Sequence, residues 1–293
     1  MVYVLYNTHA GAHLGVEKIK EKMREFFKGE ELCLVDALTV DNKQELISKI
    51  QPTDRLVIVG GDGTLNKFVN SVEDENYQFP IYCYGGGTGN DFLNDIIGVG
   101  SDGIVMINDY IRHLPTVEVN GKTYRFLNGI GYGIDGYCCE EGDKYREKCG
   151  KAPNYTTIAI KGLLGKFKTV KAKVTVDGVT AEYENVWMAP TMNGRYFGGG
   201  MMVTPEQDRL NPEHELSIVV VPCKSRLRIL TIFPKIFKGE HVKYTKVFKT
   251  FRGKSVTVEF DKPTALQIDG ETVIGVTKYS AKSYSEKKEC ATV

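Results

Sequence analysis

Two short segments of the sequence combine runs of glycine with single acidic residues, and each directly follows an apolar stretch. In the first, Leu56–Val59 precede Gly60-Gly61-Asp62-Gly63-Thr64. A glycine turn between a strand and a helix lets backbone N–H groups and the positive helix end approach an anion, typically phosphate. Because the Asp62 carboxylate would repel phosphate without an intervening cation, the segment predicts a phosphate site with Mg²⁺. An ordinary Asp-Gly turn is the alternative interpretation.

The second segment is Gly85-Gly86-Gly87-Thr88-Gly89-Asn90-Asp91-Phe92, which follows the apolar residues 81–84. Three consecutive glycines suit a backbone that comes very close to a ligand, although a flexible loop would also use them. Thr88 and Asn90 supply neutral hydrogen bonds, and Asp91 supplies a second carboxylate near a helix start. Open α/β sheets bind ligands where two strand ends face one crevice. We therefore predict that both segments line one nucleotide site.

The first ~115 residues alternate between strand and helix patterns, which predicts a parallel sheet with helices on both faces. In the stretch 15–28, for example, apolar residues recur at helical spacing with charges opposite. The expected strands are 2–6, 32–37, 56–59 and 81–84, and the expected helices lie near 15–28, 43–50, 64–73 and 102–113.

From Thr116 onward the pattern changes to pairs of strands joined by tight turns. Asn120-Gly121, Asp177-Gly178 and Asp269-Gly270 each match the signal for a two-residue hairpin. We predict that the second domain is mainly antiparallel β and sandwich-like. Its expected helices lie near 154–167 and 225–238. The predicted divisions are a nucleotide-binding α/β domain at 1–115, a β-rich domain at 116–278 and a C-terminal tail at 279–293.

Composition and charge exclude several classes of protein. Apolar residues make up 42% and charged residues 26% of the 293, which is ordinary for a soluble globular protein. A net charge of +1 gives no argument for a nucleic-acid partner. The seven cysteines form no CxxC pair, which indicates free thiols in a reducing cytoplasm. No apolar stretch approaches the ~18 residues of a membrane span, and the first residues indicate a strand rather than a signal peptide.

Taken in order along the chain, these segments resemble the catalytic domain of the diacylglycerol kinase and bacterial lipid kinase family. The resemblance is carried by Gly60–Asn66 and Gly87–Phe92 and extends over nearly the whole chain. Further matching segments, in the order of the family, are Asn7–Gly11, Phe126–Asp135, Asn193–Gly200 with the later Pro205, and Gln267–Glu271.

The resemblance implies an ATP- and Mg²⁺-dependent kinase that transfers the γ-phosphoryl group to a lipid hydroxyl, with diacylglycerol as the first expected acceptor. It makes 116–278 the lipid-substrate domain and lets 279–293 return to the first domain. Asp269 is implied as the general base, and Asp62 as a catalytic residue that holds Mg²⁺ with Asp91. The implied nucleotide-binding residues are Asn7, Gly11, Thr39, Gly60, Gly61, Gly63, Thr64, Asn66, Gly87, Thr88 and Asn90.

Three positions depart from the family pattern. Thr8 replaces a proline in the first turn, and Gly85 replaces a proline at the start of the second glycine segment. The Asp-Gly-x-Leu that helps bind a structural Mg²⁺ in the family is here Glu213-His214-Glu215-Leu216. Glu213 can replace the aspartate as a metal ligand, whereas the lost glycine argues against that metal site.

Two alternatives to a lipid kinase stay open at this point. An NAD kinase or a phosphofructokinase-like kinase of the same architecture also carries glycine-rich turns with an aspartate. The matches at 196–200 and 269–271 favour a lipid kinase over both. A nucleotide-binding protein without catalysis is the alternative from another class.

The stretch 225–238 combines apolar residues with four basic ones, Arg226, Arg228, Lys235 and Lys238. A basic amphipathic helix can lie on an anionic lipid surface, which predicts a cytoplasmic protein in peripheral contact with the inner face of the membrane. Residues 161–168 are a second candidate for this contact. A core-facing helix with a solvated basic side explains the pattern equally well. The sequence does not indicate an oligomeric state.

Overall fold

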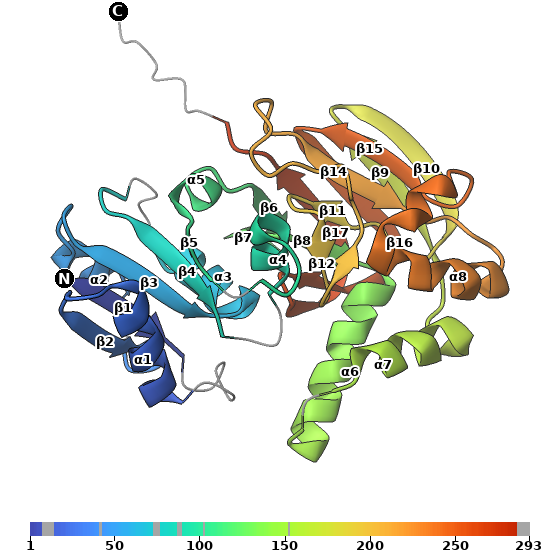
Figure 1. Cartoon of the computed structure of the whole chain (residues 1–293). Helices are drawn as coiled ribbons and strands as arrows, with labels where there is room; N and C mark the ends of the chain where they lie inside the picture. Colours follow the sequence, from blue (N-terminus) through green and yellow to red (C-terminus); the bar gives the residue numbers. More distant parts are fainter. Residues whose placement is uncertain are drawn as a thin grey trace, which may run out of the picture.

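The computed structural model describes residues 1–7, 15–40, 43–72, 77–86, 90–101, 103–151 and 153–285. These residues form two bodies, each built around its own sheet (Figure 1). The first body contains a five-stranded sheet and the second a ten-stranded sheet. This arrangement confirms the predicted fold class, an α/β domain followed by a mainly antiparallel β domain.

The first sheet has the strand order β2-β1-β3-β4-β5. Its strands are β1 (Val2–Tyr6), β2 (Leu32–Asp36), β3 (Arg55–Gly60), β4 (Ile81–Gly85) and β5 (Ile104–Met106). The first four run parallel, and β5 joins the edge antiparallel to β4. Consequently β1, β3 and β4 end at the same edge of the sheet, where the two glycine segments begin.

Helices cover both faces of this sheet, as predicted. They are α1 (Val16–Phe26), α2 (Lys43–Lys49), α3 (Asp62–Asn70), α4 (Asp91–Ile97) and α5 (Asn108–Ile111). One core contains Leu5, Ile58 and Phe68 of α3, and the opposite core contains Val4 and Met23 of α1. The prediction of a helix near 102–113 is wrong. Residues 104–106, which begin with β-branched side chains, form strand β5 and pair with β4, and only the short α5 follows.

Every strand pair in the ten-stranded sheet is antiparallel. The main path runs β15-β14-β11-β8-β16-β17-β6-β7, with β9 and β10 attached beside β16. The long strand β16 (Ser255–Ile268) pairs with β9 in its first half and with β8 in its second half. A register shift in β16 after Glu259 separates the two halves.

The strands are β6 (Thr116–Val119), β7 (Lys122–Arg125), β8 (Gly129–Tyr132), β9 (Val170–Val176), β10 (Val179–Val186), β11 (Thr191–Met192), β14 (Leu216–Val220), β15 (Lys249–Gly253) and β17 (Glu271–Lys282), with the separate pair β12 (Tyr196–Phe197) and β13 (Met201–Met202). All three predicted hairpin turns are present, and the residues Asn120, Asp177 and Asp269 each have the positive φ that such turns require.

The second domain carries more helix than the sequence predicted. The unexpected element is α6 (Ile134–Cys149), whose buried positions include Gly136 and Gly142 instead of a stripe of large apolar residues. The other helical segments are α7 (Tyr155–Lys161), η1 (Gly162–Lys166), α8 (Arg226–Ile232), η2 (Phe233–Lys238) and η3 (Glu240–Lys243). The helix expected at 225–238 changes to a 3₁₀ turn at Phe233, because Pro234 lacks the N–H that would continue it.

The C-terminal residues bring the two domains together. Strand β17 continues to Lys282 and pairs with β6, so residues 279–282 belong to the sheet rather than to a tail. Beyond it, the ring of Tyr284 stacks on His113, just before β6, at a centroid distance of 4.0 Å. No helix among the described residues is long and apolar enough to cross a membrane.

Candidate active site

The glycines of the first segment have different local tasks. Gly60 ends β3, and a Cβ there would overlap the side chain of Thr64. Gly61 is the N-cap residue of α3, and Gly63 faces open space. The helix begins at Asp62, two residues before the predicted start, so Asp62 lies in its first turn. The N-terminus of α3 is therefore exposed to a ligand through a backbone with few side chains.

The Asp62 carboxylate connects the two glycine segments. Its Oδ2 accepts a hydrogen bond from the Asp91 N–H at 2.8 Å, and its Oδ1 accepts one from the Phe92 N–H at 2.9 Å. These are the first two N–H groups of α4, which have no partner within the helix. Asp62 thus caps α4 in addition to any role in metal binding.

Asp91 connects the first domain to the second. Its carboxylate accepts hydrogen bonds from the N–H groups of Gly199 at 2.8 Å and Gly200 at 2.7 Å. Burial and then the charge of Asp62 raise the pKa of Asp91 to about 6, although both N–H groups oppose this shift. Two carboxylates are therefore close enough to repel each other, and a cation near both would relieve that repulsion.

A second connection joins α3 to the β16–β17 turn. The Asn66 side-chain amide donates to Asp269 Oδ2 at 2.8 Å, across 203 positions of sequence. The same carboxylate accepts the N–H groups of Leu127, Asn128 and Gly129 at 2.6–3.0 Å. Asp269 is buried, and this burial raises its pKa against the effect of the four donors. Two residues predicted from separate motifs therefore meet at the domain interface.

The turn that holds Asp269 also presents a more accessible carboxylate. Glu271 lies two residues further on, with its side chain 56% exposed, and forms an ion pair with Lys67 of α3 at 3.2 Å. The two acidic side chains of this turn consequently differ in environment: Asp269 is enclosed by donors and Glu271 is open to solvent.

Sequence reasoning missed an ionic cluster that clamps α4 to the second domain. Asp95 of α4 forms ion pairs with Arg195 and Arg209, each at 2.5 Å, and the side chains of Asp95 and Arg209 are both only 4% exposed. Arg209 also donates to the Leu127 carbonyl and to Asn128 Oδ1. Its guanidinium lies 4.9 Å from the centroid of the Phe92 ring. No spacing in the sequence connects these residues, because they come from three distant segments.

The remaining predicted nucleotide residues lie at the same sheet edge or outside the described residues. Asn7 directly follows β1, Thr39 lies in the turn after β2, and Asn90 is the N-cap residue of α4. Thr39 donates both its N–H and its hydroxyl to the Asp36 carbonyl. Gly11, Gly87 and Thr88 lie outside the described residues.

The structure does not bring Glu213 together with the other predicted metal ligands. Glu213 is exposed and pairs with Lys254 Nζ at 3.0 Å, which lowers its pKa. The positive charge beside Glu213 is therefore the ammonium group of Lys254, whereas the sequence predicted Mg²⁺ there. Within the part of the chain that is described, no three His, Cys, Asp or Glu side chains group as metal ligands. Asp62 and Asp91 are a pair, and Mg²⁺ in kinase sites often uses one or two carboxylates plus substrate phosphates.

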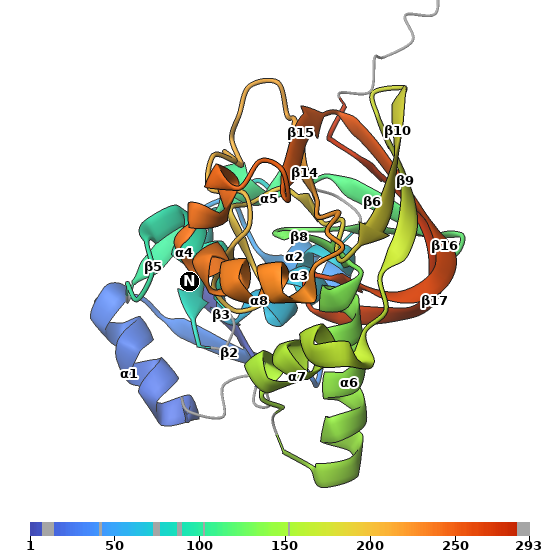
Figure 2. The ribbon, with the colours of Figure 1, turned by 90° about the vertical axis from the view of Figure 1, so that its right-hand side faces the viewer.

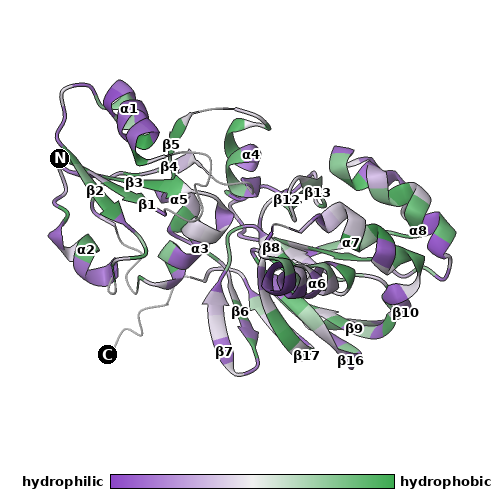
Figure 3. Ribbon diagram, turned by 90° about the horizontal axis from the view of Figure 1, so that it is seen from below, coloured by the Kyte–Doolittle hydropathy of each residue, from purple (hydrophilic) through white to green (hydrophobic). Residues whose placement is uncertain are grey.

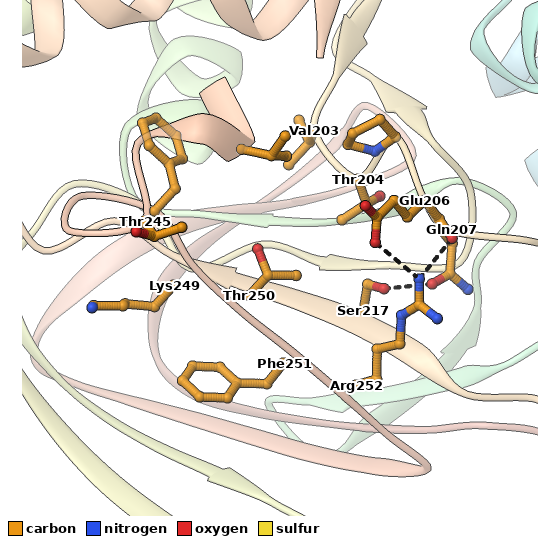
Figure 4. Close-up of a pocket in the computed structure, with 13 residues that line it drawn as sticks. Val203, Thr204, Glu206, Gln207, Ser217, Thr245, Lys249, Thr250, Phe251 and Arg252 are labelled. Atoms are coloured by element: carbon orange, nitrogen blue, oxygen red, sulfur yellow. Dashed lines mark hydrogen bonds and ion pairs between the residues drawn. The ribbon is translucent and has the colours of Figure 1, made fainter. Parts of the chain in front are cut away.

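The second domain contains a cavity of about 390 Å³ (Figure 4). Part of its lining is residues 203–207, which follow the glycine loop 198–200 in the sequence. Buried Val203, Phe248 and Ser217 are part of its lining. At the rim, Arg252 donates to the Glu206 carbonyl at 2.7 Å. The wall residue Thr204 donates to the Gly194 carbonyl, one residue before the clamping Arg195. The cavity is therefore connected to the interface by a short, hydrogen-bonded segment.

Comparison with known proteins agrees with this geometry. The family description "Diacylglycerol kinase catalytic domain" matches residues 1–117, and "YegS C-terminal NAD kinase beta sandwich-like domain" matches residues 128–282. The chain belongs to the diacylglycerol kinase and bacterial lipid kinase family. As a family member it is a phosphotransferase with an alcohol acceptor, which confirms the predicted enzyme class.

Relatives of this lipid kinase cover most of its length. A diacylglycerol kinase of Mycobacterium tuberculosis is 26% identical over 215 residues, which are 71% of this chain and 67% of the relative. The fold is similar to the crystal structure of a diacylglycerol kinase from Bacillus anthracis, with a TM-score of 0.67 at 22% identity. That match covers 97% of this chain and 94% of the solved one.

Proposed function

We propose that this kinase transfers the γ-phosphoryl group of ATP to the hydroxyl of diacylglycerol, with Mg²⁺ as cofactor and phosphatidic acid as product. The observation that carries the proposal is the contact between Asn66 and Asp269. It joins the helix of the first glycine segment to the acidic turn of the second domain. Phosphoryl transfer depends mainly on positioning and charge neutralisation, and an interface of this kind supplies the positioning.

In this proposal, ATP phosphates lie along the edge formed by β1, β3 and β4. Backbone N–H groups of the glycine segments bind the phosphates, with Asn7, Thr39, Thr64 and Asn90 at the border of the site. Gly61 and Gly63 would leave room for that close approach, and Gly60 makes room for the side chain of Thr64. Gly11, Gly87 and Thr88, the other proposed nucleotide residues, lie outside the described residues. Asp62 and Asp91 would hold Mg²⁺, which neutralises phosphate charge when bound.

The β16–β17 turn would supply the proton acceptor for the lipid hydroxyl. Asp269 is the acceptor that the family resemblance implies, and a carboxylate within hydrogen-bond reach can take this proton. Its four N–H donors also fit a positioning role, in which Asp269 fixes the turn and the exposed Glu271 takes the proton. Variants of the two residues separate these roles, as described in the Discussion.

The lipid would approach from a membrane through the surface formed by η1 and α8. These segments lie side by side (Figures 1 and 2), since Arg226 of α8 donates to the Leu163 and Phe167 carbonyls. Leu164 and Leu227 are 65% and 72% exposed. Hydrophobic and hydrophilic residues alternate along α8 (Figure 3). Exposed apolar residues among lysines and arginines suit an anionic lipid surface.

The decisive experiment incubates the purified chain with labelled ATP, Mg²⁺ and vesicles that contain one candidate acceptor each. Diacylglycerol, a monoacylglycerol, a sphingoid base and a polyprenol form the panel, and vesicles without acceptor are the control. We expect labelled phosphatidic acid from diacylglycerol vesicles and none after removal of Mg²⁺ with a chelator. Labelling of another lipid alone would reassign the acceptor, and labelling of none would reject the proposal.

A further inference from the structure

The loop Gly198–Gly200 has a backbone that only glycine adopts readily. Its φ angles are 64°, 82° and 102°. Packing does not explain the glycines at 199 and 200, because an added Cβ at either position would meet no atom within 4 Å. Gly198 and Gly199 are also exposed. The glycines are therefore needed for the backbone conformation of the loop, and the space next to Gly199 and Gly200 is open.

The backbone of this loop binds a negatively charged group, the carboxylate of Asp91. The N–H groups of Gly199 and Gly200 point to the two oxygens of the Asp91 carboxylate, at 2.8 and 2.7 Å. Successive N–H groups in a turn form a concave site that favours negatively charged groups, including phosphate. Asp91 begins α4, next to Asn90 and the second glycine segment. The anion site thus faces the edge where the proposed function places the ATP phosphates.

Asp91 occupies this site under unfavourable conditions. Asp91 is only 4% exposed, and a second carboxylate is close by, because Asp62 Oδ2 lies 2.8 Å from the backbone nitrogen of Asp91. A phosphoryl group also presents two oxygens to a pair of N–H donors, so it can replace the carboxylate while both hydrogen bonds are kept.

We propose that the N–H groups of Gly199 and Gly200 form a phosphoryl subsite, which the carboxylate of Asp91 fills until a phosphoryl group displaces it. The proposal rests on the proposed function, and it adds a contact between the phosphoryl group and the backbone of the second domain. The ligand is either the terminal phosphate of the nucleotide or the phosphomonoester of the lipid product. If Asp91 fills the subsite at least ~90% of the time, removing its carboxylate raises the apparent phosphate affinity by ~10-fold or more.

The test titrates inorganic phosphate into the ¹⁵N-glycine-labelled full chain, with and without Mg²⁺. Wild type is compared with Asp91→Ala and, in case that variant does not fold, with Asp91→Asn. Asp177→Ala is the matched control, because Asp177 Oδ1 likewise accepts two successive N–H groups, from Lys254 at 3.0 Å and Ser255 at 2.8 Å. In the titration without Mg²⁺ we expect ~10-fold tighter phosphate binding in the Asp91 variant, with movement of the Gly199 and Gly200 amide resonances, and wild-type behaviour in the control.

Two further titrations separate the ligand sources. Movement of the same resonances with a non-hydrolysable ATP analogue, but not with ADP, assigns the nucleotide's terminal phosphate; movement with a soluble short-chain phosphatidic acid assigns the product. Unmoved glycine resonances, unchanged affinity in the Asp91 variants, or an equal gain in Asp177→Ala would each overturn the subsite. The readout is binding, so it is independent of the lipid panel: a subsite that binds phosphate in a protein that phosphorylates no lipid would reject only the proposed function.

Discussion

At the scale of single residues, the aspartates of the site share one property. Asp62, Asp91 and Asp269 each accept hydrogen bonds from backbone N–H groups of segments distant in sequence. A carboxylate used in this way fixes the geometry of the segment that donates to it. Each substitution therefore changes local structure as well as charge, and stability must be measured beside activity.

The first prediction concerns Asp269 and Glu271. If Asp269 is the general base, Asp269→Asn should lower kcat by ~10²-fold or more at nearly unchanged ATP affinity, whereas Glu271→Gln should have a small effect. The reverse order of the two effects would assign the proton acceptor to Glu271. Asp177→Asn is the control, because Asp177 also lies in a hairpin turn and accepts two N–H groups far from the site.

The second prediction concerns Asp62. The Asp62 carboxylate accepts hydrogen bonds from two N–H groups of α4. Asp62→Asn replaces one of the two accepting oxygens with an NH₂ group, which cannot accept a hydrogen bond. We expect a large loss of kcat together with a ~1–3 kcal/mol decrease in the free energy of unfolding, measured by urea denaturation. Near-normal turnover in a correctly folded variant would mean that Asp62 only caps α4.

The third prediction concerns pH. The Asp135 carboxylate is buried, and burial raises its pKa to about 7, although hydrogen bonds from the backbone N–H groups of Asp135 and Gly136 oppose this shift. The unfolded chain ionises this group near pH ~4, so the folded state loses stability as pH rises from there through about 7. Asp135→Asn removes the ionisation. Its free energy of unfolding should therefore depend less on pH between 4 and 8, by up to ~4 kcal/mol. Parallel pH profiles of wild type and variant would contradict this account.

At the scale of elements, helix ends and breaks determine what the chain presents. The seven-residue α4 is held by Asp62 at its start and by Arg195 and Arg209 through Asp95. In the second domain, Pro234 divides the predicted basic helix, so its Arg226 and Arg228 lie in α8 while Lys235 and Lys238 lie in η2. The surface proposed for membrane contact is therefore built from α8 and η1 together.

The fourth prediction tests this surface. The double variant Leu164→Asp, Leu227→Asp should weaken sedimentation with anionic vesicles, because it adds negative charge to two exposed apolar positions. Val179→Asp is the control: Val179 is 76% exposed but lies on strand β10. Binding of wild type should also weaken with added salt. Equal loss in the control, or binding that ignores anionic lipid, would argue against the surface.

At the scale of the whole molecule, polar side chains join the two domains. Asn70 of α3 exchanges two hydrogen bonds with the Arg125 backbone, and Arg125 donates to the carbonyls of Val69 and Val72. Together with the Asp95 cluster, these contacts set the distance between the glycine segments and the acidic turn. An interface of this kind is specific because the polar side chains of Asn66, Asn70, Asp91 and Asp95 each have a hydrogen-bond partner on the other domain.

The fifth prediction concerns this interface. Arg209→Met should lower the free energy of unfolding by ~3 kcal/mol or more, because it leaves buried Asp95 with one arginine and removes two further hydrogen bonds. We expect kcat to fall more than ATP affinity, since the nucleotide residues belong to the first domain. Arg252→Met is the control, because Arg252 is exposed and its 3.8 Å pair with Glu206 should contribute less than ~1 kcal/mol.

The sequence by itself determined most of the elements and the two chemical motifs. Apolar runs, helical spacing and Asx-Gly turns are local signals, so they predicted the first four strands, helix α1 and all three hairpins. Local signals failed where tertiary contacts decide the outcome. Residues 104–106 form a strand because β4 offers a free edge. Helix α6 buries Gly136 against strand β16 and Gly142 against Tyr155 of α7, instead of burying a stripe of large apolar residues.

Only the tertiary structure decided which polar groups meet. The Asn66–Asp269 pair spans 203 positions, and the Asp91–Gly199 and Asp95–Arg209 contacts span 108 and 114. No spacing rule reaches that far, because whether such residues meet depends on how the two sheets pack against each other. The sequence therefore indicated phosphate chemistry at one sheet edge. The fold then showed that the second domain surrounds that edge with backbone N–H groups, two arginines and an acidic turn.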